Sequence, residues 1–257
     1  MERQRYLGKI LTKEILEQSY KKLGSLKAVG REFNVAPDTI KKYMINYGLK
    51  FKPKIRYNCN HNFFSVDNEE SFYLAGFIAA DGCIKDKNSK SGNRKFEITI
   101  SLSKKDKEFL NKLKHIMQAE NLVKDFIVKN SKRNPKWNDT WKSEITITSQ
   151  KMCEDLARFN IVPRKSLIYT FPEWMIEHPL KHHFIRGYND GDGSYYISKL
   201  PKGRITKQIY FFMRGTSEFL KEVRCILEQE CQLKKREKDI RISGGHGCLE
   251  YGGNRIV

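Results

Sequence analysis

The sequence predicts an α+β protein made of two pseudo-symmetric halves, preceded by a small all-α N-terminal domain. Three observations predict this class. The first fifty residues show helical periodicity alone, the remainder repeats one order of elements, α-β-β-α-β-β, twice, and the strands alternate apolar with polar residues. The chain has 257 residues and is 39% hydrophobic, which is enough to bury a core.

The chain is strongly basic, with 49 Lys and Arg against 30 Asp and Glu and a net charge of +19. This charge favours a polyanionic partner, above all nucleic acid. No apolar stretch approaches the roughly 18 residues of a membrane span, and no secretory signal opens the sequence. The six cysteines form no CxxC pair, which disfavours a disulfide scaffold and a zinc ribbon. We therefore expect an intracellular protein that is neither secreted nor embedded in a membrane.

Residues 1–50 predict a helix-turn-helix-like DNA-binding domain. Of its three helical segments, those at 26–33 and 38–47 are separated by a three-residue turn. Lys41 and Lys42 share an exposed stripe of the last helix and are candidate DNA contacts. An ordinary three-helix bundle is the alternative, and the basic charge of the whole chain favours DNA binding.

Residues 51–70 are expected to form a basic linker. Lys52 and Lys54 alternate with apolar residues, so an extended segment here can lie along a phosphate backbone. A solvated tether is an equal alternative. Cys59 and His61 are interpreted as structural, because two potential ligands are too few for a metal site.

Residues 71–168 are expected to form the first half and residues 169–257 the second, whose final helix is apparently missing. In the first half we expect helices at 72–81, 103–117 and 150–159, with strands at 83–87, 96–102, 124–129 and 144–148. In the second half we expect helices at 184–192 and 217–229, with strands at 194–200, 208–214, 239–243 and 248–251.

The helix that opens each half carries small residues four positions apart. They are Gly76 with Ala80 in the first helix, and Gly187 with Gly191 in the second. Residues at i and i+4 share a helix face, so each helix has a strip that another backbone can approach closely. The two helices are therefore expected to cross along these strips.

An aspartate and then a glycine follow each strip, as Asp81-Gly82 and Asp192-Gly193. Each glycine is expected to adopt the left-handed conformation that ends a helix. Crossing helices would bring the two carboxylates together at the negative ends of two helix dipoles, which is costly without a cation. Mg²⁺ is the expected occupant, with Mn²⁺ as a substitute, and a metal held by carboxylates suits phosphodiester hydrolysis.

These two helices carry a resemblance to a known family. Residues 74–82 resemble the signature of the LAGLIDADG homing endonucleases, with Phe77 and Ala79 departing from it. Residues 184–194 resemble the Gly-Tyr-x-Asp-Gly-Asp-Gly form of second copies. Segments at 162–166 and 251–255 also resemble the family, so the similarity covers about residues 65–257.

The resemblance implies a single-chain monomer with internal pseudo-two-fold symmetry, whose helix pair is the interface between halves. Its two antiparallel sheets would form a saddle over the major groove, and both DNA strands would be cut. Asp81 and Asp192 match the metal-binding acids of the family, and the carbonyls of Ala80 and Gly191 match its backbone ligands. Asp190, which matches the earlier acid of the motif, is interpreted as structural.

Basic side chains near the scissile phosphate would stabilise developing charge. Lys151, Lys165 and Arg255 are candidate catalytic residues, with ordinary surface charge as the alternative for each. His182 and His183 are interpreted as non-catalytic, because they lie about two helical turns from the second acid.

The polar faces of the hairpins are candidate DNA-reading surfaces, with solvated strand faces as the alternative. Trp137 and Trp141 are interpreted as packing residues first and DNA contacts second. The candidate DNA contacts are Lys85, Lys87, Glu97, Thr99 and Ser101 in the first half, and Tyr196, Ser198, Lys199, Arg204, Lys207 and Gln208 in the second.

Together these features predict a site-specific, metal-dependent double-strand DNA endonuclease of the kind that mobilises introns. Two alternatives stay open. One is a DNA-binding regulator that has lost cleavage, and the other is an RNA-binding splicing cofactor (a maturase), for which RNA would be the partner. A nickase is a smaller variant of the first prediction if one half is damaged.

Overall fold

The computed structural model describes residues 10–50, 57–88, 94–132, 134–197, 209–233, 240–243 and 246–252. The chain divides into two compact units, Met1–Arg56 and Tyr57–Val257. Helices and antiparallel sheets occur as the predicted α+β class requires. Within the described ranges, no helix is long and apolar enough to cross a membrane.

The N-terminal unit contains three helices in its described part, as predicted. Ser25 caps the second of them by accepting a hydrogen bond from the Ala28 amide at 3.2 Å. A proline opens the third, at a position where its missing N–H costs nothing. The helices are α2 (Lys13–Leu23), α3 (Leu26–Glu32) and α4 (Pro37–Asn46), and their core consists of Leu11, Leu16, Val29, Ile40 and Met44.

Two four-stranded antiparallel sheets form the framework of the second unit. The strand orders are the same, β1-β2-β4-β3 and β5-β6-β8-β7. The first sheet contains β1 (Gly82–Asn88), β2 (Arg94–Ser103), β3 (Lys124–Val128) and β4 (Thr140–Thr148). The second contains β5 (Gly193–Ile197), β6 (Ile209–Gly215), β7 (Arg241–Ser243) and β8 (His246–Gly252).

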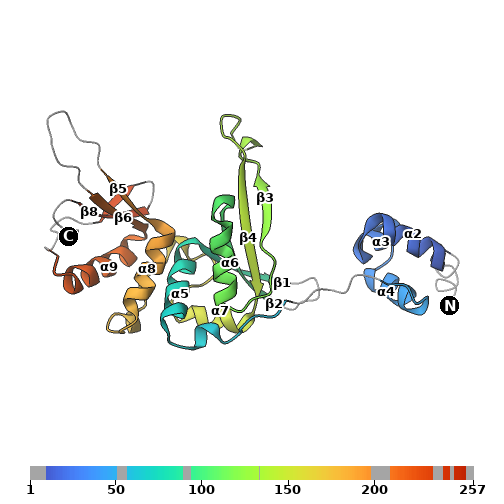
Figure 1. Ribbon diagram of the computed structural model, residues 1–257, viewed down its shortest axis with the longest axis horizontal. Helices are drawn as coiled ribbons and strands as arrows, with labels where there is room; N and C mark the ends of the chain where they lie inside the picture. The colour runs from blue at the N-terminus through green and yellow to red at the C-terminus, as the bar shows by residue number, and fades with distance from the viewer. Residues whose placement is uncertain are drawn as a thin grey trace. The chain divides into compact units, whose positions relative to one another are not determined.

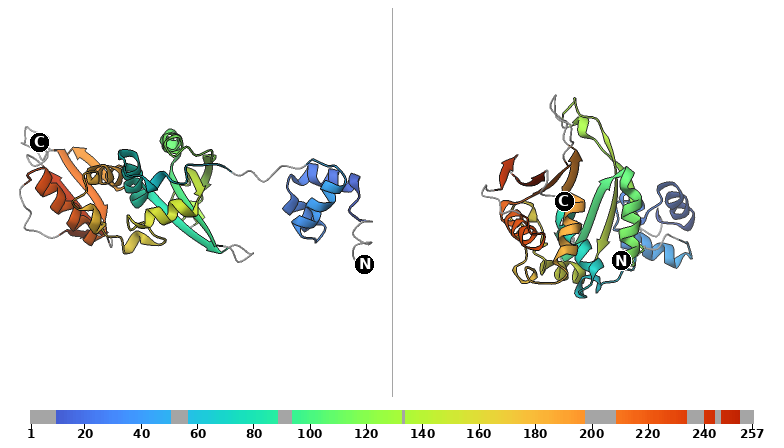
Figure 2. Two further views of the ribbon diagram at one scale, coloured as in Figure 1. Left: turned by 90° about the horizontal axis from the view of Figure 1, so that it is seen from below. Right: turned by 60° about the vertical axis from the view of Figure 1, so that its left-hand side comes forward.

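Helices pack on one face of each sheet, and α5 and α8 lie side by side between the sheets (Figures 1 and 2). The α-helices are α5 (Glu69–Asp81), α6 (Lys107–Ile116), α7 (Gln150–Ala157), α8 (Lys181–Asp192) and α9 (Ser217–Glu230). Short 3₁₀ helices are η1 (Phe63–Ser65), η2 (Lys104–Asp106), η3 (Asn130–Lys132), η4 (Lys165–Leu167) and η5 (Glu173–Met175).

The strand register makes the two halves directly comparable. Gly82 pairs with Ile100 where α5 passes into β1, and Gly193 pairs with Met213 where α8 passes into β5. Both junctions are thus built in the same way, and residues counted from these two glycines occupy equivalent places.

The expected linker is shorter than residues 51–70. Residues 51–56 lie outside the described ranges, but the chain packs on the second unit from Tyr57 onward. Phe63 and Phe64 are buried in its core, and the Asn58 amide donates to Glu120 Oε2 at 3.1 Å. The expectation is wrong here because burying two adjacent phenylalanine side chains is favourable, and an extended linker would leave both of them exposed to water.

Candidate metal centre

Helices α5 and α8 cross at the small residues that the sequence singled out. A Cβ on Gly76 would lie 2.0 Å from the Phe184 carbonyl oxygen, and a Cβ on Gly187 would lie 1.9 Å from that of Tyr73. At Gly191 an added Cβ would meet the Ala80 Cβ at 2.5 Å. The two backbones therefore approach more closely than any residue with a side chain would permit.

This crossing brings Asp81 and Asp192 together at the C-terminal ends of the two helices. A Cβ on Gly191 would lie 3.5 Å from Asp81 Oδ2, so the Asp81 carboxylate lies against the last turn of α8. Burial and then the neighbouring charge of Asp192 raise the pKa of Asp81 to about 6. Burial also raises the pKa of Asp192. Two partly desolvated carboxylates, one of which raises the pKa of the other, form a site that a cation would stabilise.

The donor set fits a hard divalent cation. Asp81 and Asp192 supply carboxylate oxygens here, and Mg²⁺ is held by one or two carboxylates with waters and substrate phosphates. Across the described ranges, no three His, Cys, Asp or Glu side chains gather into a metal-binding cluster. A closed site for a softer metal such as zinc is therefore not provided there.

Lys165 lies at this centre, as one of the three basic candidates. Its Nζ donates a hydrogen bond to the Gly82 carbonyl oxygen at 2.9 Å, and the residue is only 6% exposed. Burial lowers the pKa of Lys165, while Cys83 and then Asp192 and Asp81 act in the opposite direction. The ammonium therefore supports the junction of α5 and β1 and places positive charge beside both acids.

Three further basic residues that the sequence analysis missed act on the acids. Lys142 lowers the pKa of Asp81, and both His246 and Arg214 lower that of Asp192. Arg214, His246, Lys165 and Asp192 also line a cavity of about 370 Å³. A surface of this charge beside two acids suits a phosphate group.

Residues 68–166 match the family model of the LAGLIDADG-like domain. This match coincides with the first half, including the helix that ends at Asp81. The first half is therefore similar to a LAGLIDADG-like domain. No curated protein matches the sequence of the chain.

Solved structures similar to this chain include three homing endonucleases or meganucleases. I-WcaI bound to its DNA recognition sequence is 12% identical, with 71% of this chain and 74% of that chain covered and a TM-score of 0.48. I-DmoI in complex with DNA and Mn is 18% identical, with coverages of 71% and 88% and a TM-score of 0.43. I-SmaMI bound to uncleaved DNA in the presence of calcium ions is 14% identical, with coverages of 73% and 79% and a TM-score of 0.44.

The glycines that follow the two acids are required for a reason other than the expected one. Gly82 has φ −89° and Gly193 has φ −104°, so both are extended and the left-handed expectation was wrong. A Cβ on Gly82 would lie 2.8 Å from the Ile78 carbonyl oxygen, and one on Gly193 would lie 2.5 Å from that of Asn189. In both halves, glycine lets the strand turn directly out of the last helical turn.

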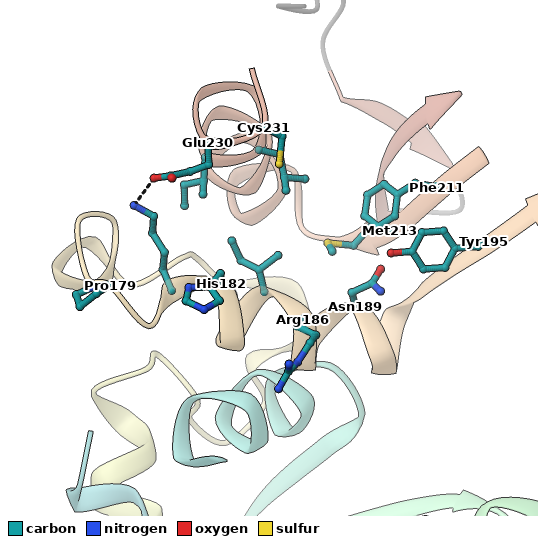
Figure 3. Close-up of a pocket in the computed structure, with 13 residues that line it drawn as sticks. Pro179, His182, Arg186, Asn189, Tyr195, Phe211, Met213, Glu230 and Cys231 are labelled. Carbon is teal, nitrogen blue, oxygen red and sulfur yellow. Dashed lines mark ion pairs between the residues drawn. The ribbon is translucent and has the colours of Figure 1, made fainter. Parts of the chain in front are cut away.

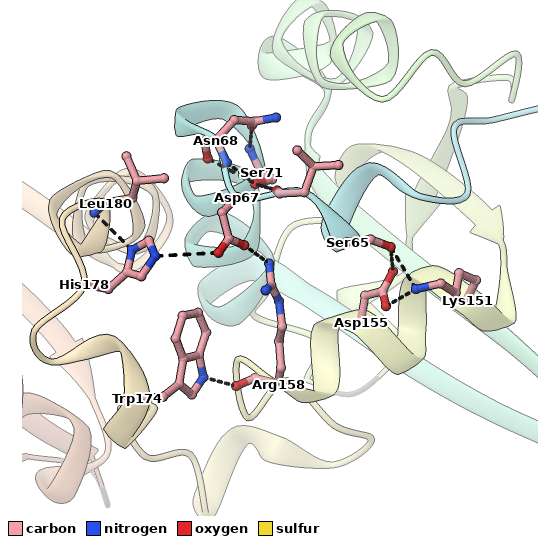
Figure 4. A network of polar contacts seen from close by, with 11 residues as sticks. Ser65, Asp67, Asn68, Ser71, Lys151, Asp155, Arg158, Trp174, His178 and Leu180 are labelled. Carbon is pink, nitrogen blue, oxygen red and sulfur yellow. Dashed lines mark hydrogen bonds and ion pairs between the residues drawn. The ribbon is translucent and has the colours of Figure 1, made fainter.

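Lys151 lies in a different network, on α7 (Figure 4). Its Nζ donates to Ser65 Oγ at 2.8 Å and forms an i,i+4 ion pair with Asp155. It is not among the charges that act on either acid of the centre. The third basic candidate, Arg255, lies outside the described residues.

The candidate DNA contacts in the first sheet are partly enclosed. Glu97 is only 7% exposed and pairs with Lys95, and Thr99 is 4% exposed with its Oγ1 3.4 Å from that of Thr146. These two side chains lie on the polar face of β2, as predicted, but neighbouring strands cover them there. Ser101 and Lys85 are half-buried on the same side.

In the second sheet, Tyr196 is the candidate DNA contact that lies within the described residues. Its ring stacks on Tyr210 with centroids 5.1 Å apart, and its hydroxyl donates to Glu250 Oε1 at 3.0 Å. In the N-terminal unit, Lys41 and Lys42 are exposed on α4. The Lys87 side chain and residues Lys52, Lys54, Ser198, Lys199, Arg204, Lys207 and Gln208 lie outside the described part of the chain.

The other interpretations have mixed outcomes. Asp190 is structural, because its Oδ2 accepts a hydrogen bond from the Tyr73 hydroxyl at 2.8 Å across the helix pair.

Trp137 and Trp141 are 56% and 51% exposed, so the interpretation as packing residues was wrong. Lys104 Nζ instead lies 4.5 Å from the centre of the Trp141 ring, as a surface cation–π pair. His183 is buried near the start of α8, with its Nε2 3.7 Å from Glu69.

Proposed function

We propose that this protein is a site-specific double-strand DNA endonuclease of the homing type, which hydrolyses phosphodiester bonds with a divalent cation, Mg²⁺ or Mn²⁺. One observation carries the proposal. Asp81 and Asp192 meet at the ends of two crossing helices, in the same register relative to the two sheets. One chain supplies both acids, so the proposed active form is a monomer that binds duplex DNA.

In this proposal Asp81 and Asp192 hold the cation, together with the carbonyls of Ala80 and Gly191. The cation would supply an activated water and charge stabilisation at the leaving oxygen. Lys165 keeps its ammonium beside both carboxylates while bonded to the Gly82 carbonyl, and it can attract the scissile phosphate.

Binding is proposed to use two further basic features. Arg214 and His246 line the cavity next to Asp192, where they can contact phosphate oxygens. The exposed Lys41 and Lys42 on α4 are proposed to add contacts from the N-terminal unit.

The test is cleavage of a randomised plasmid-site library in Mg²⁺ by the wild type and by Asp81→Asn and Asp192→Asn. We expect double-strand cuts at one site, lost by more than about 100-fold in both variants, because each removes a proposed metal ligand. Asp190→Asn is the matched control, since Asp190 lies on the same helix but is bonded to Tyr73. It should retain cleavage.

Other outcomes would replace this proposal with one of its alternatives. Specific DNA binding without cutting in Mg²⁺ or Mn²⁺ would leave a DNA-binding regulator. Preferential binding of RNA over DNA would favour a splicing cofactor. Cutting of a single strand would indicate a nickase.

A further inference from the structure

The two acids of the candidate centre have different neighbours at one equivalent position. Phe77 and Tyr188 lie equally far in sequence before the two junction glycines, on α5 and α8. Both are buried, with exposures of 2% and 3%. The second half therefore carries a buried hydroxyl where the first half carries none.

Packing holds the Tyr188 ring in one place. The ring lies parallel to that of Tyr169, with centroids 6.2 Å apart and an interplanar angle of 6°. Its contact with Phe219 is closer, with centroids 4.1 Å apart. A ring fixed by two aromatic neighbours directs its hydroxyl along one line, because rotation about the side-chain bonds is blocked.

The hydroxyl of Tyr188 is directed at the metal centre. Tyr188 lies one turn before Asp192 on α8, and both residues line the same cavity, so the hydroxyl can reach the Asp192 carboxylate as a hydrogen-bond donor. In such a pair the phenol hydroxyl donates the hydrogen bond and the carboxylate accepts it.

The opposite strand makes room for this hydroxyl. A Cβ on Gly215 would lie 2.8 Å from the Tyr188 hydroxyl oxygen. The register places Leu102 at the equivalent position of β2, because Gly82 pairs with Ile100 as Gly193 pairs with Met213. The first half thus combines Phe with Leu, and the second combines Tyr with Gly. This exchange of volume indicates that the second half is built around the hydroxyl.

We propose that Tyr188 is a positioning residue that orients the Asp192 carboxylate toward a divalent cation, and that Asp81 has no such tyrosine among the described residues. The inference rests on the proposed function, because it assigns a role within the same site. A hydrogen bond to a ligating carboxylate fixes the orientation of its free oxygen and so reduces the cost of ordering it on binding. The two acids then differ in preorganisation although they are equivalent in the fold.

The experiment compares Tyr188→Phe with Tyr169→Phe. Both remove one hydroxyl from a buried, stacked ring, but the Tyr169 hydroxyl donates to the Phe159 carbonyl oxygen at 3.1 Å and not to an acid. Mn²⁺ binding is measured by electron paramagnetic resonance, with and without duplex DNA, and strand-resolved cleavage is measured in parallel. We expect Tyr188→Phe to weaken Mn²⁺ binding roughly 10-fold and to slow one strand more than the other, leaving nicked DNA. Tyr169→Phe should leave Mn²⁺ binding unchanged.

A second variant keeps the hydroxyl and displaces it. Gly215→Ala places a methyl group against the hydroxyl oxygen, so we expect weaker Mn²⁺ binding here also. Unchanged Mn²⁺ binding in Tyr188→Phe, equal losses in both tyrosine variants, or no Mn²⁺ binding by the wild type would overturn the inference. If Mn²⁺ binding falls in Tyr188→Phe alone while the wild type cuts no DNA, the positioning role stands and the proposed endonuclease fails.

Discussion

The two halves of the second unit share a topology but differ in what surrounds it. Their sheets have the same strand order, and α5 and α8 pass into β1 and β5 in the same register. The small strips, the terminal aspartate and the following glycine are retained in both. The small strips lie where the halves touch each other, so a change in either strip alters the shared interface.

Away from that interface the halves diverge. Ile84 and Tyr195 are equivalent by register, but Ile84 is 4% exposed and Tyr195 is 64% exposed. The second half has a cavity of about 440 Å³ between α8, α9 and the β5–β6 hairpin, lined by Ile185, Phe211 and other apolar side chains (Figure 3). In the first half, α7 packs against β2. The comparison shows that the fold requires the helix crossing in both halves and tolerates a less covered sheet in one.

The polar sides of the two sheets also differ in chemistry. The first presents Lys85 and Ser101 beside enclosed threonine and glutamate side chains. The second presents the stacked pair Tyr196 and Tyr210, with Arg214 near the Phe212 ring. Under the proposed function, two such unlike faces would suit an asymmetric DNA site.

The largest expected effect comes from breaking the shared crossing. Gly76→Ala or Gly187→Ala forces a methyl group to within about 2 Å of a carbonyl oxygen, so we expect each to destabilise the fold by more than about 3 kcal/mol. Gly24→Ala is the control, since it meets no atom within 4 Å and carries only the strain of φ +69°, about 1 kcal/mol. Chemical denaturation measures both. Similar small losses for all three variants would contradict the crossing.

A smaller effect tests the divergence of the halves. Ile84→Ala should cost about 2–4 kcal/mol, because it opens a cavity in a closed core. Tyr195→Ala should cost less than about 1 kcal/mol, because the side chain is mostly exposed. Equal losses in denaturation experiments would show that the second sheet is covered as well as the first.

A still smaller effect concerns the acids without metal. The pKa of Asp81 is raised to about 6, so its charge destabilises the fold, and the stability present below about pH 4 is lost as the pH rises through 6. Asp81→Asn should therefore stabilise the metal-free protein at pH 8 by on the order of 1 kcal/mol, discounted for the partial exposure of Asp81. Melting temperatures in chelator at pH 4 and pH 8 measure this. A gain that does not grow with pH would show that the charge of Asp81 does not destabilise the fold.

Much of the fold was predictable because its signals are local. Alternation predicted β2, helical periodicity predicted α2 and α3, and the strips of Gly76 and Gly187 predicted the crossing. The conformation of Gly82 was mispredicted, because an aspartate–glycine pair at a helix end has two solutions. Both a left-handed turn and a direct exit into a strand disfavour any residue that has a Cβ. The course of the chain in the tertiary structure decides which of the two conformations the glycine adopts.

The site was only partly predictable, because its basic residues converge from distant elements. Arg214 and Lys142 alternate with the buried Met213 and Ser143, so strand periodicity could have identified them. No sequence pattern signals His246, whose place depends on the pairing of β7 with β8. Lys151 was a candidate catalytic residue because it follows β4, the last strand of the first half. Its ion pair with Asp155, one turn further along α7, holds its ammonium in a different network from that of the two acids.

The central claim is that Asp81 and Asp192 together form one metal centre, and Mn²⁺ binding tests it most directly. Mn²⁺ affinity would be measured by electron paramagnetic resonance in the wild type, Asp81→Asn, Asp192→Asn and Asp190→Asn. We expect each of the first two variants to lose binding by more than about 10-fold and Asp190→Asn to retain it. Wild-type affinity in either Asp81→Asn or Asp192→Asn, or an equal loss in Asp190→Asn, would contradict a centre shared by the two halves.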